Sequence, residues 1–434
     1  MTFGPGSIPP TPVSPAARPL LPAAATVVSP AIRRSILLLS FATFASMVAQ
    51  RICDAMLPEL SRTFAVSLAQ AASVVSVFAV VYGASQLVYG PLGDRLGKFG
   101  VVTWATLACS VGSLVAVFAG SLPMLVFARV LMALGAAAII PLSMAWIGDE
   151  VAYEQRQETL ARVGLGTTLG IGFGQLAGGL LTDTLGWRWA FGLMTVLFGA
   201  VGWLLHANWR GQPAQPAKST EPEAGPAPGF VAQALGIVTG PWSRIVLVVA
   251  FLEGASGFGV LAIWALHLNR SLALSLSASG AIVALFGVGG VFYMVFARHL
   301  IRRLGERGLA LVGGALLGVS ALCVGFVPVW WLVLVASLLG GFGFFMFHNT
   351  MQTNATQMST RARGTGVSLF AASLFMGQSA GVLMATQLVG VLGSGLVIAL
   401  GGAVMAALGL VFSLALKQRE RLIRQGQVDE SLPA

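Results

Sequence analysis

An acidic residue occurs within one of the long apolar segments of this chain, where a charge is costly. Glu253 lies in the run AFLEGASGFG, near the middle of the apolar segment 245–266. A carboxyl group at that depth is expected to stay protonated until water or a cation reaches it. Glu253 is therefore a candidate for carrying a proton across a membrane. A structural acid held by hydrogen bonds is the alternative.

Asp54 and Arg51 form a second candidate pair. They are three positions apart, which places them on one face of a helix, where they can form an ion pair. The pair lies toward one end of its apolar segment, 35–58. It is either an interfacial ion pair or a substrate or proton site at the mouth of a cavity. Asp54 is accordingly the second proton-coupling candidate, and Arg51 is a candidate for contacting a substrate.

Four further polar residues in apolar surroundings are candidates for lining such a cavity. Arg129 lies inside the segment 123–147, where an arginine costs roughly 2.5–3.5 kcal/mol on insertion scales. It should face a partner or a cavity, or else extend its guanidinium to the interface. The others are Gln175, His348 and Gln378. His348 opens a polar run that either binds a ligand or satisfies a helix end.

A charged turn, YGPLGDRLGKFG, occupies residues 89–100 between two apolar runs. Because each run can cross a bilayer, the charges must lie at a water boundary. An aspartate at a helix end can accept hydrogen bonds from the free N–H groups at the start of a neighbouring helix. The turn therefore predicts a latch between helices, with a solvated turn as the alternative. The latch residues are Gly90, Asp94, Arg95, Gly97, Lys98 and, as acids available to Arg95, Asp149 and Glu154.

The composition indicates which elements position these side chains. Hydrophobic residues make up 56% of the 434 residues and charged ones only 9%, against roughly 25% charged residues in a soluble domain. Apolar runs near the length of about 20 residues that spans a bilayer recur along the chain. The predicted fold class is an all-α integral membrane protein with twelve spans. The expected spans are 35–58, 66–90, 99–119, 123–147, 164–182, 189–206, 245–266, 276–297, 308–327, 330–350, 364–388 and 392–416.

The distribution of basic residues predicts the orientation. The net charge is +10, and 20 of the 25 Lys and Arg residues fall in segments on one predicted side, against three on the other. By the positive-inside rule, both termini are expected in the cytoplasm, in a multi-pass protein of the inner membrane. The basic charge is thus a topological signal rather than an indication of nucleic-acid binding.

The spans fall into two groups of six that resemble each other. LGDRLGK at 92–98 is echoed by LIRRLGE at 300–306, and GQLAG at 174–178 by GQSAG at 377–381. Two such echoes at nearly the same separation predict two pseudo-repeats around a central cavity. The two expected six-helix bundles are residues 35–207 and 245–416, joined by a cytoplasmic linker at 208–244. An N-terminal arm, 1–34, precedes them and a tail, 417–434, follows them.

The turn at 90–100 resembles the signature loop between the second and third spans of the major facilitator superfamily, G-x-L-x-D-R-x-G-R-K. Lys98 stands for the arginine of that pattern, and Phe99 departs from its second basic position. Arg129, followed six residues later by a glycine, resembles the fourth-span motif of the family. The resemblance implies twelve helices in the superfamily fold and places the start of span eleven, near Thr365, opposite Asp94.

Span five resembles the motif G-x-x-x-G-P-x-x-G-G of drug/proton antiporters, with Gln175 in place of the proline. Small residues at this spacing allow close helix packing. The helix-packing residues are Gly170, Gly174, Gly178 and Gly179.

The resemblance implies a secondary active transporter of a small organic solute that works by alternating access. Proton-coupled efflux is the expected activity, and a proton-coupled importer is the alternative in the same fold. A membrane enzyme or a sensor is disfavoured, since the chain shows no catalytic motif, metal-ligand spacing or large soluble output domain. The expected partners are the solute, protons and the lipid bilayer, for a monomer that uses the proton gradient and no cofactor. Substrate, direction and coupling ion stay open at this stage.

Overall fold

The computed structural model describes residues 29–210, 229–359 and 362–425, without the side chains of residues 153, 154 and 157. Every regular element within these ranges is a helix, so the all-α prediction is confirmed. The first half contains α1 (Pro30–Arg51), α2 (Leu57–Thr63), α3 (Leu68–Ala71), α4 (Ser73–Leu96), α5 (Lys98–Val117), α6 (Leu122–Glu150), α7 (Tyr153–Thr184) and α8 (Trp187–Arg210). The second contains α9 (Phe230–Thr239), α10 (Pro241–Glu253), the π-helix η1 (Gly254–Gly259), α11 (Trp264–Ser271), α12 (Leu276–Phe326), α13 (Trp330–Thr356), α14 (Arg363–Leu392) and α15 (Ser394–Arg424).

These helices supply the twelve predicted spans. Ten helical stretches within the described residues are long and apolar enough to cross a membrane. One of them, α12, comprises two spans, because Gly305 with φ of 61° interrupts its helical backbone. The remaining span is α7, whose many glycines and threonines make it less apolar. The chain is thus a multi-pass membrane protein with the expected number of spans.

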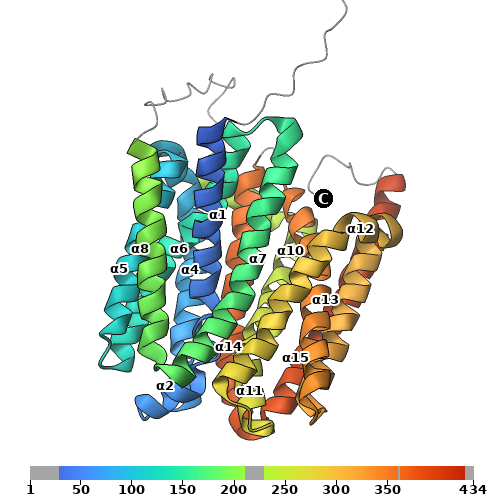
Figure 1. Cartoon of the computed structure of the whole chain (residues 1–434). Coiled ribbons are helices and arrows are strands. Elements are labelled where there is room, and N and C mark those ends of the chain that lie inside the picture. Colours follow the sequence, from blue (N-terminus) through green and yellow to red (C-terminus); the bar gives the residue numbers. More distant parts are fainter. Residues whose placement is uncertain (1–28, 211–228, 360–361, 426–434) are drawn as a thin grey trace, which may run out of the picture.

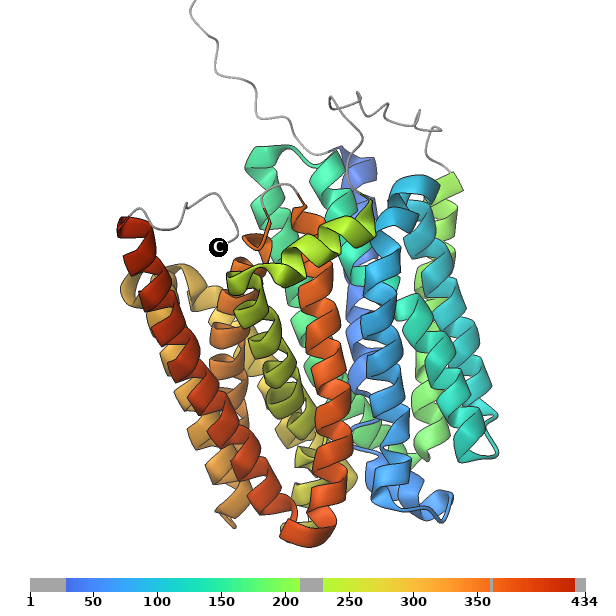
Figure 2. The ribbon, with the colours of Figure 1, turned by 180° about the vertical axis from the view of Figure 1, so that it is seen from behind.

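Both halves begin and end on the same side of the bundle (Figures 1 and 2). The start of α1 and the end of α15 lie at one end, here called the termini end, and α9 lies across it. The helices α2 and α11 lie at the opposite end, here called the far end. Figure 2 shows α14 beside α4, and Figure 1 shows α7 beside α12, so these two pairs join the halves.

Several helix boundaries differ from the sequence expectation. The first span ends at Arg51 rather than at residue 58, because a separate helix, α2, begins at Leu57 with Pro58 in its first turn. Helix α15 continues to Arg424, since a helix can extend into water beyond the hydrocarbon layer. Within the segment expected to be a linker, α8 reaches Arg210 and residues 230–239 form α9, while residues 211–228 lie outside the described part. The expected arm, 1–34, is described only from residue 29.

The predicted packing glycines place the backbone of α7 against two other helices. A Cβ built on Gly170, Gly174 or Gly178 would lie 2.6, 2.9 or 2.1 Å from backbone oxygens of α1 and the turn after it. A Cβ on Gly179 would lie 2.2 Å from the carbonyl oxygen of Leu276 in α12. Real Cβ atoms do not approach this closely, so only glycine permits these contacts.

The same packing recurs in the second half. Gly174 and Gly178 cover the carbonyls of Val48 and Ile52, as Gly377 and Gly381 of α14 cover those of Phe251 and Ala255. In all four of these contacts, the glycine follows the residue whose carbonyl it covers by the same number of positions in the sequence. By this correspondence, Gln50 in the first half occupies the position of Glu253 in the second, and Gln175 that of Gln378.

We expect Gly178→Ala to destabilise the protein by at least about 1–3 kcal/mol, because the added methyl group overlaps the carbonyl of Ile52. The matched control is Gly164→Ala on the same helix, where the nearest atom to an added Cβ is the Met294 methyl at 3.9 Å. Thermal unfolding of the purified protein in detergent measures both variants. Equal melting temperatures would show that α1 and α7 can separate without cost.

Candidate functional site

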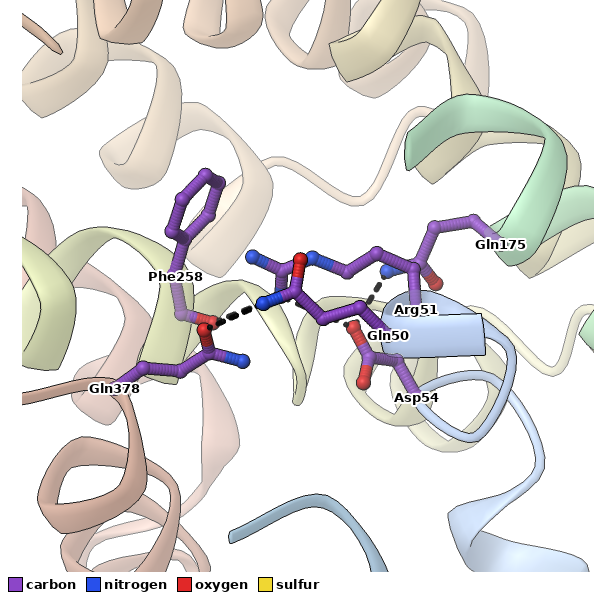
Figure 3. A network of polar contacts seen from close by, with 6 residues as sticks. All are labelled: Gln50, Arg51, Asp54, Gln175, Phe258 and Gln378. Carbon is purple, nitrogen blue, oxygen red and sulfur yellow. Dashed lines mark hydrogen bonds and ion pairs between the residues drawn. The ribbon is translucent and has the colours of Figure 1, made fainter. Parts of the chain in front are cut away.

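Arg51 and Asp54 are fully buried within the protein and belong to the polar network of Figure 3. Arg51 is the last residue of α1, and Asp54 lies in the turn that follows. The Arg51 Nη1 and Asp54 Oδ2 atoms are 3.4 Å apart, which is long for an ion pair. The shorter hydrogen bond of Asp54 comes from Gln175 of α7, whose Nε2 donates to the same oxygen over 2.8 Å. The glycines on either side of Gln175 bring α7 close enough for this bond.

Two further contacts carry this network from the first half into the second (Figure 3). The Nη1 of Arg51 also donates to the backbone oxygen of Phe258 in η1, at 3.3 Å, and its guanidinium lies 4.1 Å from the centroid of the Phe258 ring. The Nε2 of Gln50 donates to the Oε1 of Gln378 in α14, at 3.4 Å. Polar groups of α1 thus connect the two halves inside an otherwise apolar interior.

The other acidic candidate, Glu253, pairs with the polar candidate His348. The His348 Nδ1 and Glu253 Oε1 atoms are 2.8 Å apart, with Glu253 fully buried and 17% of the His348 side chain exposed. The imidazole stacks on the Phe344 ring, with centroids 5.5 Å apart and planes inclined by 11°. Aromatic rings of Phe258, Phe345 and Phe370 also surround it. The predicted inner-end histidine is therefore the partner of the predicted proton carrier.

Glu253 ends α10 and directly precedes the π-helix η1. A π-helical turn is uncommon and is frequent at functional sites. Gly254 at its start lets this turn pack directly on α14, because a Cβ there would lie 1.9 Å from the carbonyl oxygen of Leu374. The turn also places the Phe258 ring 4.4 Å from that of Phe344. Phe258 therefore lies between the Arg51–Asp54 pair and the Glu253–His348 pair.

Arg129 lies in a different environment from Arg51. Its Nη1 donates to the Ala49 oxygen at 2.7 Å and its Nε to the Val74 oxygen at 3.0 Å. The guanidinium also covers the Phe78 ring at 4.0 Å. All of these contacts lie within the first half, where they hold α1, α4 and α6 together. They are the contacts of a helix clamp, and a substrate contact for Arg129 stays a prediction.

The latch residues lie at the termini end. The Asp94 carboxylate is 68% exposed and 3.4 Å from the Lys98 Nζ. Lys98, rather than the exposed Arg95, binds Asp149, with Nζ and Oδ2 2.6 Å apart. Gly90 and Gly97 have no atom within 4 Å of an added Cβ, and the Glu154 side chain lies outside the described residues. Among the described residues, no hydrogen bond or ion pair joins the Asp94 side chain to the start of α14.

Thr365, the expected neighbour of Asp94, instead donates its hydroxyl to the Gln233 Oε1 of α9 at 2.9 Å. In the second half, the residue equivalent to Lys98 is Glu306, which accepts a hydrogen bond from the Asn354 amide at 3.0 Å. In each half, the charged turn is therefore joined to the end of a helix of the same half, α6 in the first and α13 in the second.

The titratable groups of the site lie in one chain of contacts. No group of acidic, histidine or cysteine side chains in the described part of the chain could hold a metal ion. Glu253, His348 and Asp54 can each take up or release a proton, and they lie in a chain of contacts across the two halves.

Two members of the network were not predicted from the sequence. Gln50 adjoins Arg51 within an apolar run and lies at the repeat position of Glu253, so its polarity was an available signal. Phe258 contributes a backbone oxygen and a ring face, and a phenylalanine among apolar residues gives no indication of either.

Comparisons with known proteins agree with this architecture. The family model of the Major Facilitator Superfamily matches residues 39–255 and 246–430. The uncharacterized MFS-type transporter YwfA of Bacillus subtilis is 23% identical over 70% of this chain and 72% of its own. The multidrug export protein EmrB of Escherichia coli K12 is 29% identical, over only 35% of this chain and 30% of its own. A bacterial homologue of the lysosomal transporter Spinster, solved in an inward-facing, occupied conformation, superposes with a TM-score of 0.67 at 18% identity, over 89% of this chain and 96% of its own.

We expect Arg129→Gln to lower the free energy of unfolding by about 3 kcal/mol or more, because it removes two charge-assisted hydrogen bonds to buried carbonyls. Thermal unfolding of the purified protein measures this loss. A variant that stays as stable as the wild type but no longer transports would instead place Arg129 in contact with the solute.

Proposed function

Because this chain belongs to the Major Facilitator Superfamily of membrane transporters, we propose that it exports a small organic solute in exchange for protons. The observation that carries this proposal is the Glu253–His348 pair. It is buried beside a π-helical break and is connected through Phe258 to the contacts that join the two halves. A proton that changes the charge of this pair therefore acts on the interface that must rearrange during transport.

The proposed cycle alternates the side to which the site opens. We place the termini end in the cytoplasm, since the charge distribution of the loops favours it. Arg51 and Gln50 join the halves toward the far end, while Asp94 at the termini end is exposed and not engaged with α14. This arrangement corresponds to a state that is open to the cytoplasm, ready to load a solute for export.

In this scheme, Glu253 takes up a proton when the site faces the outside and loses it toward the cytoplasm. His348 is partly exposed and contacts Glu253 directly, so it is the group through which the proton leaves. Solute binding and the deprotonated pair then favour the return to the outward-open state. The proton gradient is the energy source, and the protein acts as a monomer in the inner membrane.

Export is favoured over import by the partial match to EmrB, which is named as a multidrug export protein. One observation favours the import alternative. Helix α7 carries Gln175 in place of the proline typical of antiporters, and its amide is committed to Asp54. A proton-coupled importer would use the same acids with solute and proton moving together.

We expect Glu253→Gln to abolish proton-coupled exchange, because glutamine keeps the shape of the side chain but cannot titrate. Everted membrane vesicles with an imposed proton gradient measure this as the loss of solute-induced dissipation of the gradient. The control is Glu158→Gln, a substitution of a 70% exposed acid of α7. Dissipation at the wild-type rate in the Glu253 variant would remove this residue from the proton path, and uptake together with protons would favour import.

We expect Asp94→Asn to slow turnover about 2- to 5-fold, which corresponds to the roughly 0.5–1 kcal/mol of a charge at a helix N-terminus. Its carboxylate is exposed in the present state, so solute affinity and thermal stability should change little. Parallel measurement of turnover and binding separates the two effects. Unchanged turnover would make Asp94 a solvated turn residue.

A further inference from the structure

We propose that Arg51 and the amide groups around it form a subsite for the carboxylate of a small organic acid that also carries a hydrogen-bond donor. This inference rests on the proposed transport function and assigns a chemical class to its solute. The residues involved are Gln50, Arg51, Asp54, Gln175 and Gln378 (Figure 3).

The free edge of the Arg51 guanidinium carries the first part of the argument. Its Nη1 makes both of its hydrogen bonds, to Asp54 and Phe258, whereas its buried Nε and Nη2 atoms have no hydrogen-bond partner. Nε–H and Nη2–H point in parallel and match the two oxygens of a carboxylate. The unused edge of Arg51 is therefore the edge that binds carboxylates in bidentate fashion.

Arg51 is also held loosely in its present contacts. Its two hydrogen bonds measure 3.3 and 3.4 Å, beyond the usual range of about 2.7–3.2 Å. Arg129, which is equally buried, has bonds of 2.7 and 3.0 Å to carbonyl oxygens. Arg129 leaves one guanidinium nitrogen, Nη2, without a partner, whereas Arg51 leaves both Nε and Nη2, the edge that can bind a carboxylate.

The neighbouring groups define the rest of the ligand. Four buried atoms around Arg51 have no hydrogen-bond partner: Gln378 Nε2, which donates, and Gln50 Oε1, Gln175 Oε1 and Asp54 Oδ1, which accept. Leaving a buried polar group unpaired costs about 1–3 kcal/mol, and more for a charged group. A ligand with a carboxylate for the donors and an ammonium, hydroxyl or amide N–H for the acceptors satisfies both sets.

The position of the subsite adds an apolar requirement. The Phe258 ring contacts both the Arg51 guanidinium and the Phe344 ring, which in turn stacks on His348. A solute bound at Arg51 therefore has aromatic side chains beside its remaining part. The solute class that fits is an aromatic acid bearing an N–H or O–H group.

The test measures equilibrium binding to the full chain in phosphatidylglycerol nanodiscs by isothermal titration calorimetry. The probes are phenylalanine, hippurate and 4-hydroxybenzoate, and the affinity of each acid is compared with that of its primary amide. We expect at least one acid to bind and its amide to bind about 10- to 100-fold more weakly, as for the loss of charge-assisted hydrogen bonds. An amide that binds as well as its acid, or no binding by any acid at millimolar concentration, would overturn the proposal.

The matched variants are Arg51→Lys and Arg188→Lys. Lysine keeps the charge but lacks the parallel N–H pair, so Arg51→Lys should weaken acid binding about 10- to 100-fold. Arg188 also donates to a backbone oxygen, at 2.9 Å, and covers an aromatic ring, but it lies at the start of α8 away from the network, so its variant should bind as the wild type does. Wild-type affinity in Arg51→Lys would contradict the assignment.

The acid-and-amide comparison uses the unmodified protein, so it does not depend on how either variant folds. Binding without any proton-coupled movement of the acid would contradict the proposed function and leave the subsite intact. Proton-coupled movement of some other compound, with no binding of these acids, would contradict the subsite alone.

Discussion

The structure depends on a contact between backbones, in which glycines of α7 lie directly on carbonyls of α1 and glycines of α14 lie on those of α10 and η1. Because the helices approach so closely, the short amide side chains of Gln175 and Gln378 reach the polar residues of the neighbouring helix and of the opposite half. Larger residues at these glycines would hold the helices apart and leave Asp54 without its best hydrogen bond. The repeated glycine spacing is therefore what allows charged groups to be buried between the halves.

The buried ionisable groups differ in how completely their partners satisfy them. Arg129 is held by two short bonds to carbonyls and contributes to the rigidity of the first half. Arg51 and Asp54 lie where the halves meet; Arg51 has two longer bonds and leaves two nitrogens without a partner, against one for Arg129, and Asp54 leaves one oxygen unpaired. Such incomplete pairing is costly in an apolar interior. It is better explained by groups that change partners during a transport cycle than by groups that only stabilise one state.

The sequence predicts the spans and the acids well, because both follow from local composition. Apolar length predicts twelve crossings, and the rarity of charge in them identifies Glu253, Asp54, Arg51 and Arg129. Contacts between residues that are distant in the sequence do not follow from local composition. His348 reads as a helix-end residue, and its contact with Glu253 arises only because α10 and α13 pack together. The role of Phe258 rests on a carbonyl in a π-helical turn, which no side-chain pattern encodes.

The two equivalent turns at the termini end are fastened by different chemistry. In the first half, Lys98 binds Asp149 through opposite full charges, whereas in the second half a neutral amide of Asn354 donates to Glu306. Dissolved salt screens the former attraction strongly and the latter weakly. The two turns are therefore symmetric in shape but unequal in their response to ionic strength, since added electrolyte weakens the Lys98–Asp149 contact more than the Asn354–Glu306 contact.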